Sequence, residues 1–314
     1  MATFTDAQKS PSQRNVLPNS PGKKVEYGIV MGCPRSGTTF LMTCLNALPY
    51  SECVSGHLLP VPIPHIVNCS LDSEVYEALS RSIPFAFQDY LESVAQARVP
   101  AVARWLNGAM ASGELIQALQ RKRTIKRLIY KEPFLSFATE FIYNALPNCR
   151  IVHIYRDGRD AADSLVRRYN VLTDEKLMTL STAEMPLGRK YDHRYVPWWV
   201  EVGLEAEFLD CTPYLRAIWM WKEMVRRCHD FFSLPEVVAS GRVMLLKYED
   251  LVSNPLQHGE SVVSHFDGVM NNQLQTKFKQ AKISSIGIHK RREQQEVEAA
   301  ENIAQAELEL YGYL

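Results

Sequence analysis

The stretch that most restricts the fold joins an apolar segment, a glycine-containing loop and a second apolar segment near the start of the chain. VEYGIVMG, residues 25–32, has the pattern of a buried strand that ends in glycine. TTFLMTCLNAL, residues 38–48, has the pattern of a helix that stops before Pro49. A strand, a loop with glycines and a helix, in that order, are the setting in which a loop holds an anion at a helix N-terminus. We therefore expect an α/β fold with an anion site after its first strand.

The loop between these segments reads GCPRSGTT, from Gly32 to Thr39. Its two glycines are separated by four residues, which is the spacing of a phosphate-binding loop. The nucleotide-hydrolase version has lysine directly after the second glycine, and here that position is Thr38. Without this lysine, the terminal phosphate of a nucleoside triphosphate is poorly neutralised.

The remaining polar groups of the loop suit a compact anion that needs no metal. Backbone N–H groups of residues 35–39, which include Gly37, are expected to point at the anion, and Arg35 adds a fixed positive charge. Ser36, Thr38 and Thr39 add hydroxyl donors. A sulfuryl group fits this set because it carries less negative charge than a phosphoryl group, so that fewer cations suffice.

Composition limits the partners and the compartment. The chain has 314 residues with 35 Lys+Arg and 35 Asp+Glu, so a chain-wide role in binding nucleic acid is not expected. Its seven cysteines include no CxxC pair, which argues against a disulfide framework or a zinc site and favours a reducing, cytoplasmic location. No apolar run reaches the ~18–20 residues of a membrane span. Residues 1–24 read as a disordered tail and 25–314 as a single domain.

Strand and helix patterns alternate along the rest of the chain. Residues 128–133, 150–157 and 243–251 have strand patterns, with helical patterns between them. This alternation predicts a three-layer α/β fold of the phosphate-loop type, with a central parallel sheet flanked by helices. Polar residues follow these strands at Lys131-Glu132 and at 156–159, and we expect them to meet the first loop at one edge of the sheet.

Other segments are less regular. Residues 56–70 contain three prolines and are not expected to form a regular helix, whereas 72–121 look mostly helical. Residues 171–211 look mixed and are long enough to be a functional insertion. The final helical segment repeats apolar residues at steps of three and four, which predicts one buried face. These residues are Val297, Ala300, Ala304, Leu308 and Tyr311.

Four stretches resemble the sulfotransferases that use 3′-phosphoadenosine 5′-phosphosulfate (PAPS). They are CPRSGTTFL, RIVHIYRDGRDAADSLVRR, LLKYEDLVSNP and KISSIGIHKRR. The first is similar to the family's 5′-phosphosulfate loop, with Arg35 where soluble cytosolic members carry lysine. The block that ends in the second stretch most resembles the branch of protein-tyrosine sulfotransferases and many bacterial enzymes. The resemblance implies a single α/β domain.

The same resemblance implies how the nucleotide is held. Arg156 and Ser164 have the spacing of the family's arginine–serine pair at the 3′-phosphate. Tyr248 matches a tyrosine near the nucleotide. Ser285 and Lys290 match the C-terminal segment that closes over it, with Arg291 as an alternative to Lys290.

The implied reaction moves a sulfuryl group from PAPS to an acceptor O–H or N–H, through a loose transition state in which positioning and electrostatics dominate. Arg35 and Lys131 are the candidates to stabilise the leaving nucleotide, with Ser285 as a possible aid. No metal is required.

A base should deprotonate the acceptor. In the branch named above, a glutamate follows a glycine some twenty residues after the loop, and here the matching dipeptide is Gly56-His57. Imidazole titrates near neutrality, so His57 is the candidate base. His65, His193 and Glu52 are weaker candidates.

Residues 191–210 bear on the acceptor, which we expect to be a small molecule rather than a protein. They interleave aromatic side chains with acids, namely Tyr195, Trp198 and Trp199 with Glu201, Glu205, Glu207 and Asp210. One hypothesis is a cationic, guanidinium-bearing acceptor, as in enzymes that tailor saxitoxin-like natural products. The other is an amphipathic segment with its tryptophans in the core.

Two other functions stay open at this stage. A small-molecule or nucleotide kinase predicts turnover of ATP with magnesium, and Thr38 in the lysine position speaks against it. A non-catalytic nucleotide-binding module predicts binding of adenosine 3′,5′-bisphosphate (PAP) without turnover.

Overall fold

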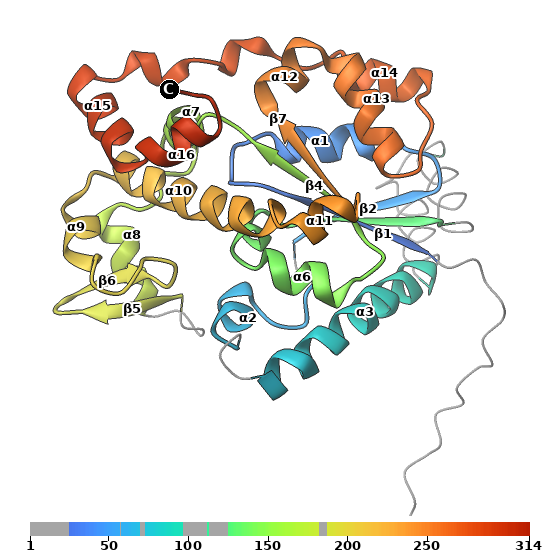
Figure 1. Cartoon of the computed structure of the whole chain (residues 1–314), viewed down its shortest axis with the longest axis horizontal. Coiled ribbons are helices and arrows are strands. Elements are labelled where there is room, and N and C mark those ends of the chain that lie inside the picture. Colours follow the sequence, from blue (N-terminus) through green and yellow to red (C-terminus); the bar gives the residue numbers. More distant parts are fainter. Residues whose placement is uncertain (1–24, 57, 70–72, 97–111, 113–124, 182–186) are drawn as a thin grey trace, which may run out of the picture.

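The centre of the protein is a five-stranded parallel sheet with the strand order β2-β3-β1-β4-β7 (Figure 1). The computed structural model describes residues 25–56, 58–69, 73–96, 112, 125–181 and 187–314. The strands are β1 (Glu26–Met31), β2 (Ser51–Ser55), β3 (Arg127–Lys131), β4 (Arg150–Tyr155) and β7 (Val243–Lys247). The predicted tail, residues 1–24, lies outside the described residues.

The inner strands are apolar on both faces because helices cover both faces. Along β1, Ile29 and Met31 belong to one core cluster, and Val30 belongs to the other. The Val30 face is covered by α1 (Thr38–Leu45), α12 (Tyr248–Ser253), α13 (Pro255–His265) and α14 (Asn272–Phe278). The expected three-layer α/β fold is confirmed.

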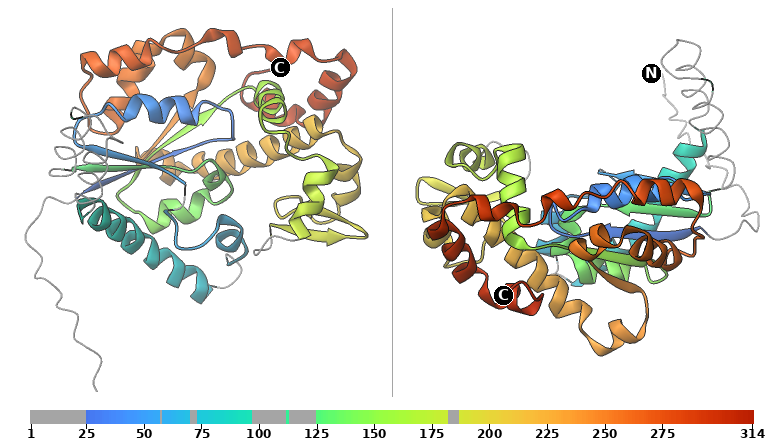
Figure 2. Two further views of the ribbon diagram at one scale, coloured as in Figure 1. Left: turned by 180° about the vertical axis from the view of Figure 1, so that it is seen from behind. Right: turned by 90° about the horizontal axis from the view of Figure 1, so that it is seen from above.

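The opposite face of the sheet is covered by a second set of helices (Figure 2) and carries the larger core cluster. It is covered by α3 (Ser73–Gln96), α6 (Thr139–Ala145), α7 (Gly158–Tyr169), α10 (Pro213–Phe232), α15 (Gln294–Ile303) and α16 (Gln305–Leu310). Val297, Ala300, Ala304 and Leu308 are all buried, as the repeat predicted, although the helix is interrupted at Ala304, which lies between α15 and α16.

Several expectations about single elements are corrected. Residues 63–69 form a helix, α2 (Ile63–Cys69), despite the prolines, because Pro64 falls in its first turn, where no backbone N–H is needed. Strand β2 was not anticipated. The expected strand at 243–251 ends at Lys247, and Tyr248 begins a helix. The expected helix after β3 starts as a 3₁₀ turn, η1 (Pro133–Phe137).

The mixed segment 171–211 contains a second, two-stranded sheet. Its antiparallel strands are β5 (Gly188–Tyr191) and β6 (Arg194–Pro197). Short helices flank the hairpin, namely α8 (Asp174–Met178), η2 (Thr179–Ser181) and α9 (Glu205–Asp210). The remaining short helices are α11 (Pro235–Ala239), η3 (Ile283–Ser285) and η4 (Ile288–Arg291). None of the described helices is long and apolar enough to cross a membrane.

Candidate functional site

The sheet topology brings the predicted site residues to one edge. All five strands are parallel, so their carboxyl ends lie together. The phosphate-binding loop follows β1, Lys131 ends β3, Arg156 follows β4 and Tyr248 follows β7. Because β1 lies between β3 and β4, the loop is central at this edge.

The loop needs glycine at two positions because neighbouring atoms leave no room for a side chain. A Cβ atom on Gly32 would lie 2.0 Å from the carbonyl oxygen of Ile154. A Cβ atom on Gly37 would lie 2.5 Å from the Tyr248 ring. Gly37 also has a φ of 98°, which favours glycine. The loop backbone is therefore pressed against β4 and against the residue that follows β7.

The hydroxyl groups of the loop differ in their environment. Ser36 is fully buried, and its Oγ has no hydrogen-bond partner among the described residues. Thr38 is also buried, whereas Thr39 is exposed. A buried hydroxyl without a partner is costly, and an anion in the loop would supply the missing acceptor.

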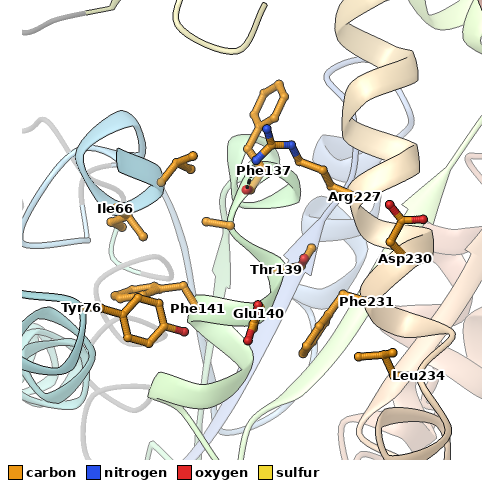
Figure 3. A pocket seen from close by; sticks show the side chains of 12 residues that line it. Ile66, Tyr76, Phe137, Thr139, Glu140, Phe141, Arg227, Asp230, Phe231 and Leu234 are labelled. Atoms are coloured by element: carbon orange, nitrogen blue, oxygen red, sulfur yellow. Dashed lines mark hydrogen bonds between the residues drawn. The ribbon is translucent and has the colours of Figure 1, made fainter. Parts of the chain in front are cut away.

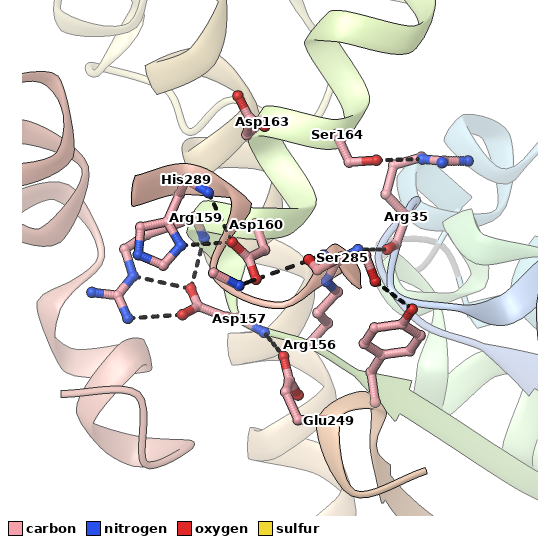
Figure 4. A network of polar contacts seen from close by, with 12 residues as sticks. Arg35, Arg156, Asp157, Arg159, Asp160, Asp163, Ser164, Glu249, Ser285 and His289 are labelled. Atoms are coloured by element: carbon pink, nitrogen blue, oxygen red, sulfur yellow. Dashed lines mark hydrogen bonds and ion pairs between the residues drawn. The ribbon is translucent and has the colours of Figure 1, made fainter. Parts of the chain in front are cut away.

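Arg35 connects the loop to α7. Its backbone is in the left-handed region, with a φ of 75°. Its Nε donates a hydrogen bond to the Ser164 Oγ at 3.0 Å (Figure 4). Its guanidinium lies over the Tyr169 ring, 5.7 Å from the ring centre. The side chain is thus held along α7 with its remaining N–H groups still able to donate.

Arg156 lies at the centre of the polar network. Its Nη1 donates to the carbonyl oxygen of Arg35 at 3.0 Å, and its Nη2 donates to the carbonyl oxygen of Ser285. The guanidinium also lies 4.8 Å from the centre of the Tyr248 ring, and the Tyr248 hydroxyl is 2.7 Å from the Ser285 Oγ. Its Nε is buried and has no partner among the described residues. Arg35, Arg156, Ser164, Tyr248 and Ser285 therefore form one connected group.

Asp160 was missed by the sequence analysis and fastens the C-terminal segment to α7. Its carboxylate accepts hydrogen bonds from the backbone N–H groups of Gly287 and His289 at 2.7 and 3.0 Å, and lies 2.6 Å from His289 Nδ1. Its Oδ2 is 3.6 Å from Arg156. Burial alone would raise the pKa of Asp160, but the contacts with His289, Gly287 and Arg156 outweigh burial and lower it. The i, i+4 spacing from Arg156 was the available sequence signal.

The first turn of α7 is held by Trp221 of α10. The Trp221 Nε1 donates to the carbonyl oxygen of Arg156 at 3.0 Å. A Cβ atom on Gly158 would lie 2.4 Å from the Trp221 ring, so only glycine allows this approach. Asp157 caps the helix by accepting from the Arg159 N–H at 2.9 Å. These contacts fix the direction in which Arg156 leaves the sheet.

Lys131 and Lys290 lie outside this network. The Lys131 side chain is half-buried and makes no hydrogen bond or ion pair within the described part of the chain. Lys290 and Arg291 are exposed on η4. Lys290 lines a pocket of about 790 Å³ that neither Arg156 nor Arg291 lines.

The candidate bases occupy different surroundings. His57 lies outside the described residues; the chain reaches it from β2, whose Ser55 pairs with Lys131. His65, on α2, has a buried Nδ1 without a partner in the described structure. His193 is exposed and lies 2.6 Å from Asp192, and Glu52 accepts a hydrogen bond from Tyr90 at 3.2 Å.

The aromatic and acidic residues of 191–210 do not gather at one site. Trp199 is buried and packs on Phe137 and Phe208 in the core. Glu205 is buried and pairs with Arg189 at 2.7 Å. Trp198 is different, since it is half-buried and lines a pocket of about 480 Å³ with residues that follow β2 and β3.

A further pocket of about 390 Å³ lies between α2, α6 and α10 (Figure 3). Arg227 lines it, lies 5.9 Å from the centre of the Phe137 ring and pairs with Glu223 of its own helix. None of the predicted site residues lines this pocket. Among the described residues, no group of three or more His, Cys, Asp or Glu side chains could hold a metal ion.

Comparison with known proteins gives one family. A model described as "Sulfotransferase family" matches residues 29–210, more than half of the chain. No curated protein sequence matches the chain.

Several solved structures are similar at low identity. The sulfotransferase domain of the Synechococcus PCC 7002 olefin synthase has 16% identity and a TM-score of 0.47, over 91% of this chain and 97% of that chain. The sulfotransferase domain from the curacin biosynthetic pathway has 15% identity and a TM-score of 0.47, over 93% and 99%. Sulfotransferase STF9 from Mycobacterium avium has 15% identity and a TM-score of 0.44, over 94% and 78%.

Proposed function

The chain belongs to the sulfotransferase family, and from that premise we propose that it transfers a sulfuryl group from PAPS to a hydroxyl or amino group of a small molecule. The observation that carries this proposal is the connected group of Arg35, Arg156, Ser164, Tyr248 and Ser285 at one edge of the sheet. These residues come from four separate parts of the chain. One ligand with an anionic group at each of two positions explains why they meet.

The residues present fit PAPS on two observations. Neither the buried Ser36 hydroxyl nor the Nε of buried Arg156 has a partner in the part of the chain that the structure describes. We assign the 5′-phosphosulfate to Arg35 and to the loop groups of Ser36, Gly37, Thr38 and Thr39. Both unpartnered groups are donors, so they match the oxygen acceptors of phosphate and sulfate.

The 3′-phosphate is assigned to Arg156, Ser164 and Ser285. Lys290 of η4, which lies outside this network in the structure, is assigned to the same phosphate. Asp160 already offsets part of the charge of Arg156, since the two side chains are 3.6 Å apart. Ser164 accepts from Arg35 at 3.0 Å, so its hydroxyl proton is available to an anion. We assign Tyr248 to the nucleotide because its ring already packs on Arg156 and Gly37.

The donor supplies the sulfuryl group, whose S–O bond to the 5′-phosphate breaks as the acceptor atom bonds to sulfur. Arg35 and Lys131 stabilise the negative charge that grows on the 5′-phosphate. Lys131 suits this role because its ammonium group has no other partner in the described structure. His57 takes the proton of the acceptor O–H or N–H.

Calorimetric titration with PAP and, separately, with ATP and magnesium tests the proposal. We expect PAP to bind and ATP with magnesium to bind at least about a hundredfold more weakly, because Thr38 replaces the lysine that reaches the terminal phosphates. Tight binding of ATP with magnesium and none of PAP would favour a kinase and refute the proposal. If PAP binds but no acceptor in a broad panel is sulfated, the result would indicate a non-catalytic nucleotide-binding module.

A further inference from the structure

The peptide unit between Arg156 and Asp157 is held from both sides by side chains. Its carbonyl oxygen accepts a hydrogen bond from the Nε1 of buried Trp221 at 3.0 Å. Its N–H group donates to the Oε1 of half-buried Glu249 at 3.1 Å (Figure 4). The two polar groups of a trans peptide point in opposite directions, so a donor on one side and an acceptor on the other fix the orientation of the peptide plane.

Glu249 reaches this peptide from the start of α12. It directly follows Tyr248, the first residue of that helix. Tyr248 contacts Arg156 at the guanidinium group, which lies 4.8 Å from the ring centre. Glu249 holds the peptide that follows the same arginine. The first two residues of α12 therefore act on the side-chain end and on the backbone end of Arg156.

The second oxygen of Glu249 is held by Tyr313. The Tyr313 hydroxyl donates to the Glu249 Oε2 at 2.9 Å. The Tyr313 carbonyl oxygen accepts from the Arg159 Nη2 at 2.9 Å, and the Lys247 ammonium group lies 4.3 Å from the centre of the Tyr313 ring. The carboxylate thus has a donor on each oxygen, which leaves it little freedom to rotate.

The charge of Glu249 does not explain its presence at this position. Burial raises the pKa of its carboxyl group, the hydrogen bonds from Asp157 and Tyr313 lower it by less, and the charge of Asp157 adds to the rise. With a raised folded-state pKa, the stabilising effect of the group is complete below the unfolded pKa, about 4.3, and is lost as the pH rises through the folded value. The negative charge therefore adds no stability at neutral pH, and the side chain supplies a hydrogen-bond acceptor at a fixed place.

We propose that Glu249 is a positioning residue for the nucleotide: by holding the peptide after Arg156, it sets the direction from which the Arg156 guanidinium reaches the 3′-phosphate. This inference rests on the proposed function, which assigns that phosphate to Arg156. The guanidinium also bonds the carbonyl oxygens of Arg35 and Ser285, so it has little room to compensate for a displaced backbone. Loss of the Glu249 acceptor therefore weakens the contact with the 3′-phosphate more than the contacts with the rest of the nucleotide.

The ratio of the affinities for PAP and adenosine 5′-monophosphate (AMP) tests the inference, because AMP differs from PAP only in lacking the 3′-phosphate. Calorimetry with the full chain would measure both dissociation constants. We expect the parent protein to bind PAP at least about a hundredfold more tightly than AMP, since arginine forms charge-assisted hydrogen bonds with phosphate. A substitution that only loosens the fold should weaken both ligands by a similar factor and leave the ratio unchanged.

Three substitutions separate the reach of Glu249 from its charge. Glu249→Gln keeps an oxygen for the Asp157 N–H and removes the charge, so the ratio should stay within about twofold of the parent value. Glu249→Asp keeps the charge but is one carbon shorter, and Glu249→Met keeps the length but loses both oxygens. Each of these two should lower the ratio by at least about fivefold, through weaker binding of PAP. The control Glu260→Met makes the same change at an exposed position on α13 and should leave both constants unchanged.

The outcomes separate this inference from the proposed function. If the parent protein prefers PAP but Glu249→Asp keeps the ratio, or Glu249→Gln loses it, the inference is wrong and the assignment of PAP stands. A Glu249→Met protein that folds and keeps the ratio also overturns it. If circular dichroism shows that this variant does not fold, the Asp and Gln variants decide. If the parent protein does not bind PAP, the proposed function is lost and the inference is lost with it.

Discussion

Arg156 donates a hydrogen bond from its Nη1 to the backbone carbonyl oxygen of Arg35 at 3.0 Å. This bond joins the residue after β4 to the loop after β1. The side chain of Arg35 in turn donates to Ser164 of α7. Hydrogen bonds thus join the residues proposed for the two ends of the nucleotide. A substitution at either end should therefore also change how the other end binds.

We expect Arg156→Lys to weaken PAP binding by about tenfold to a hundredfold. Lysine keeps the charge, but it cannot bridge the carbonyl oxygens of Arg35 and Ser285 and face a phosphate at the same time. Calorimetric titration with PAP measures the loss. Arg168→Lys, at an exposed position on α7, is the matched control. Equal affinities for the two variants would remove Arg156 from the nucleotide site.

Gly37→Ala should lower stability and impair PAP binding. An alanine at a φ of 98° costs about 1–2 kcal/mol, and its Cβ would collide with the Tyr248 ring 2.5 Å away. Gly203→Ala is a close control, since Gly203 has a φ of 99° and no atom of the described residues lies within 4 Å of its Cβ position. It should lose similar backbone energy and keep its affinity for PAP. Urea unfolding and PAP titration of both variants make the comparison. A Gly37→Ala protein that binds PAP normally would contradict the close packing of the loop.

Asp160→Asn should destabilise the protein in a pH-dependent manner. The folded-state pKa of Asp160 is lowered, so its stabilising effect is present above the unfolded pKa, about 3.9, and is lost as the pH falls through the folded value. At pH 7 the loss should be about 2–4 kcal/mol, since a buried, charged acceptor of several hydrogen bonds is removed. At pH 3 the difference from the parent protein should be smaller.

Urea unfolding at the two pH values tests this. Asp89→Asn, which changes an exposed carboxylate on α3, should give no difference at either pH. A loss from Asp160→Asn that is the same at pH 7 and pH 3 would mean that the charge of Asp160 is not what stabilises the C-terminal segment.

His57→Ala should retain PAP affinity and lose at least about a hundredfold in kcat, because a general base is removed from the acceptor. His65→Ala serves as the comparison, since His65 lies on α2 in the proline-rich region and was the weaker candidate. PAP titration and steady-state sulfation assays of both variants decide between them. If His65→Ala loses turnover and His57→Ala does not, the base is reassigned to His65.

Local patterns determined the elements at the centre of the fold. Each of β1, β3 and β4 is a short, mostly apolar run, and burial on both faces makes such runs recognisable in the sequence. His153 of β4 is the polar exception and is fully buried. β2 was missed for the opposite reason. It is an edge strand of half-buried, partly polar residues, SECVS, whose pairing with β3 depends on a segment more than seventy residues away.

The candidate site residues could be identified from the sequence in the same way, because the spacing of a loop and the position of a strand end are local properties. Their proposed roles remain predictions. The contacts among them were not readable: Arg35 bonds Ser164, and Asp160 bonds His289, each across 129 positions of the chain. Strand order and helix packing bring such residues together, and neither is encoded in a short window.

The sequence alone thus established the fold class, the phosphate-binding loop and the resemblance to sulfotransferases. Only the tertiary structure showed that Trp199 is buried in the core and that Glu205 is buried and paired with Arg189. It also showed that Glu132 and Trp198 line the same pocket. The physical reason is that an aromatic or acidic residue has the same pattern whether it packs in the core or faces a ligand. Its neighbours in space decide which, and those neighbours come from distant parts of the chain.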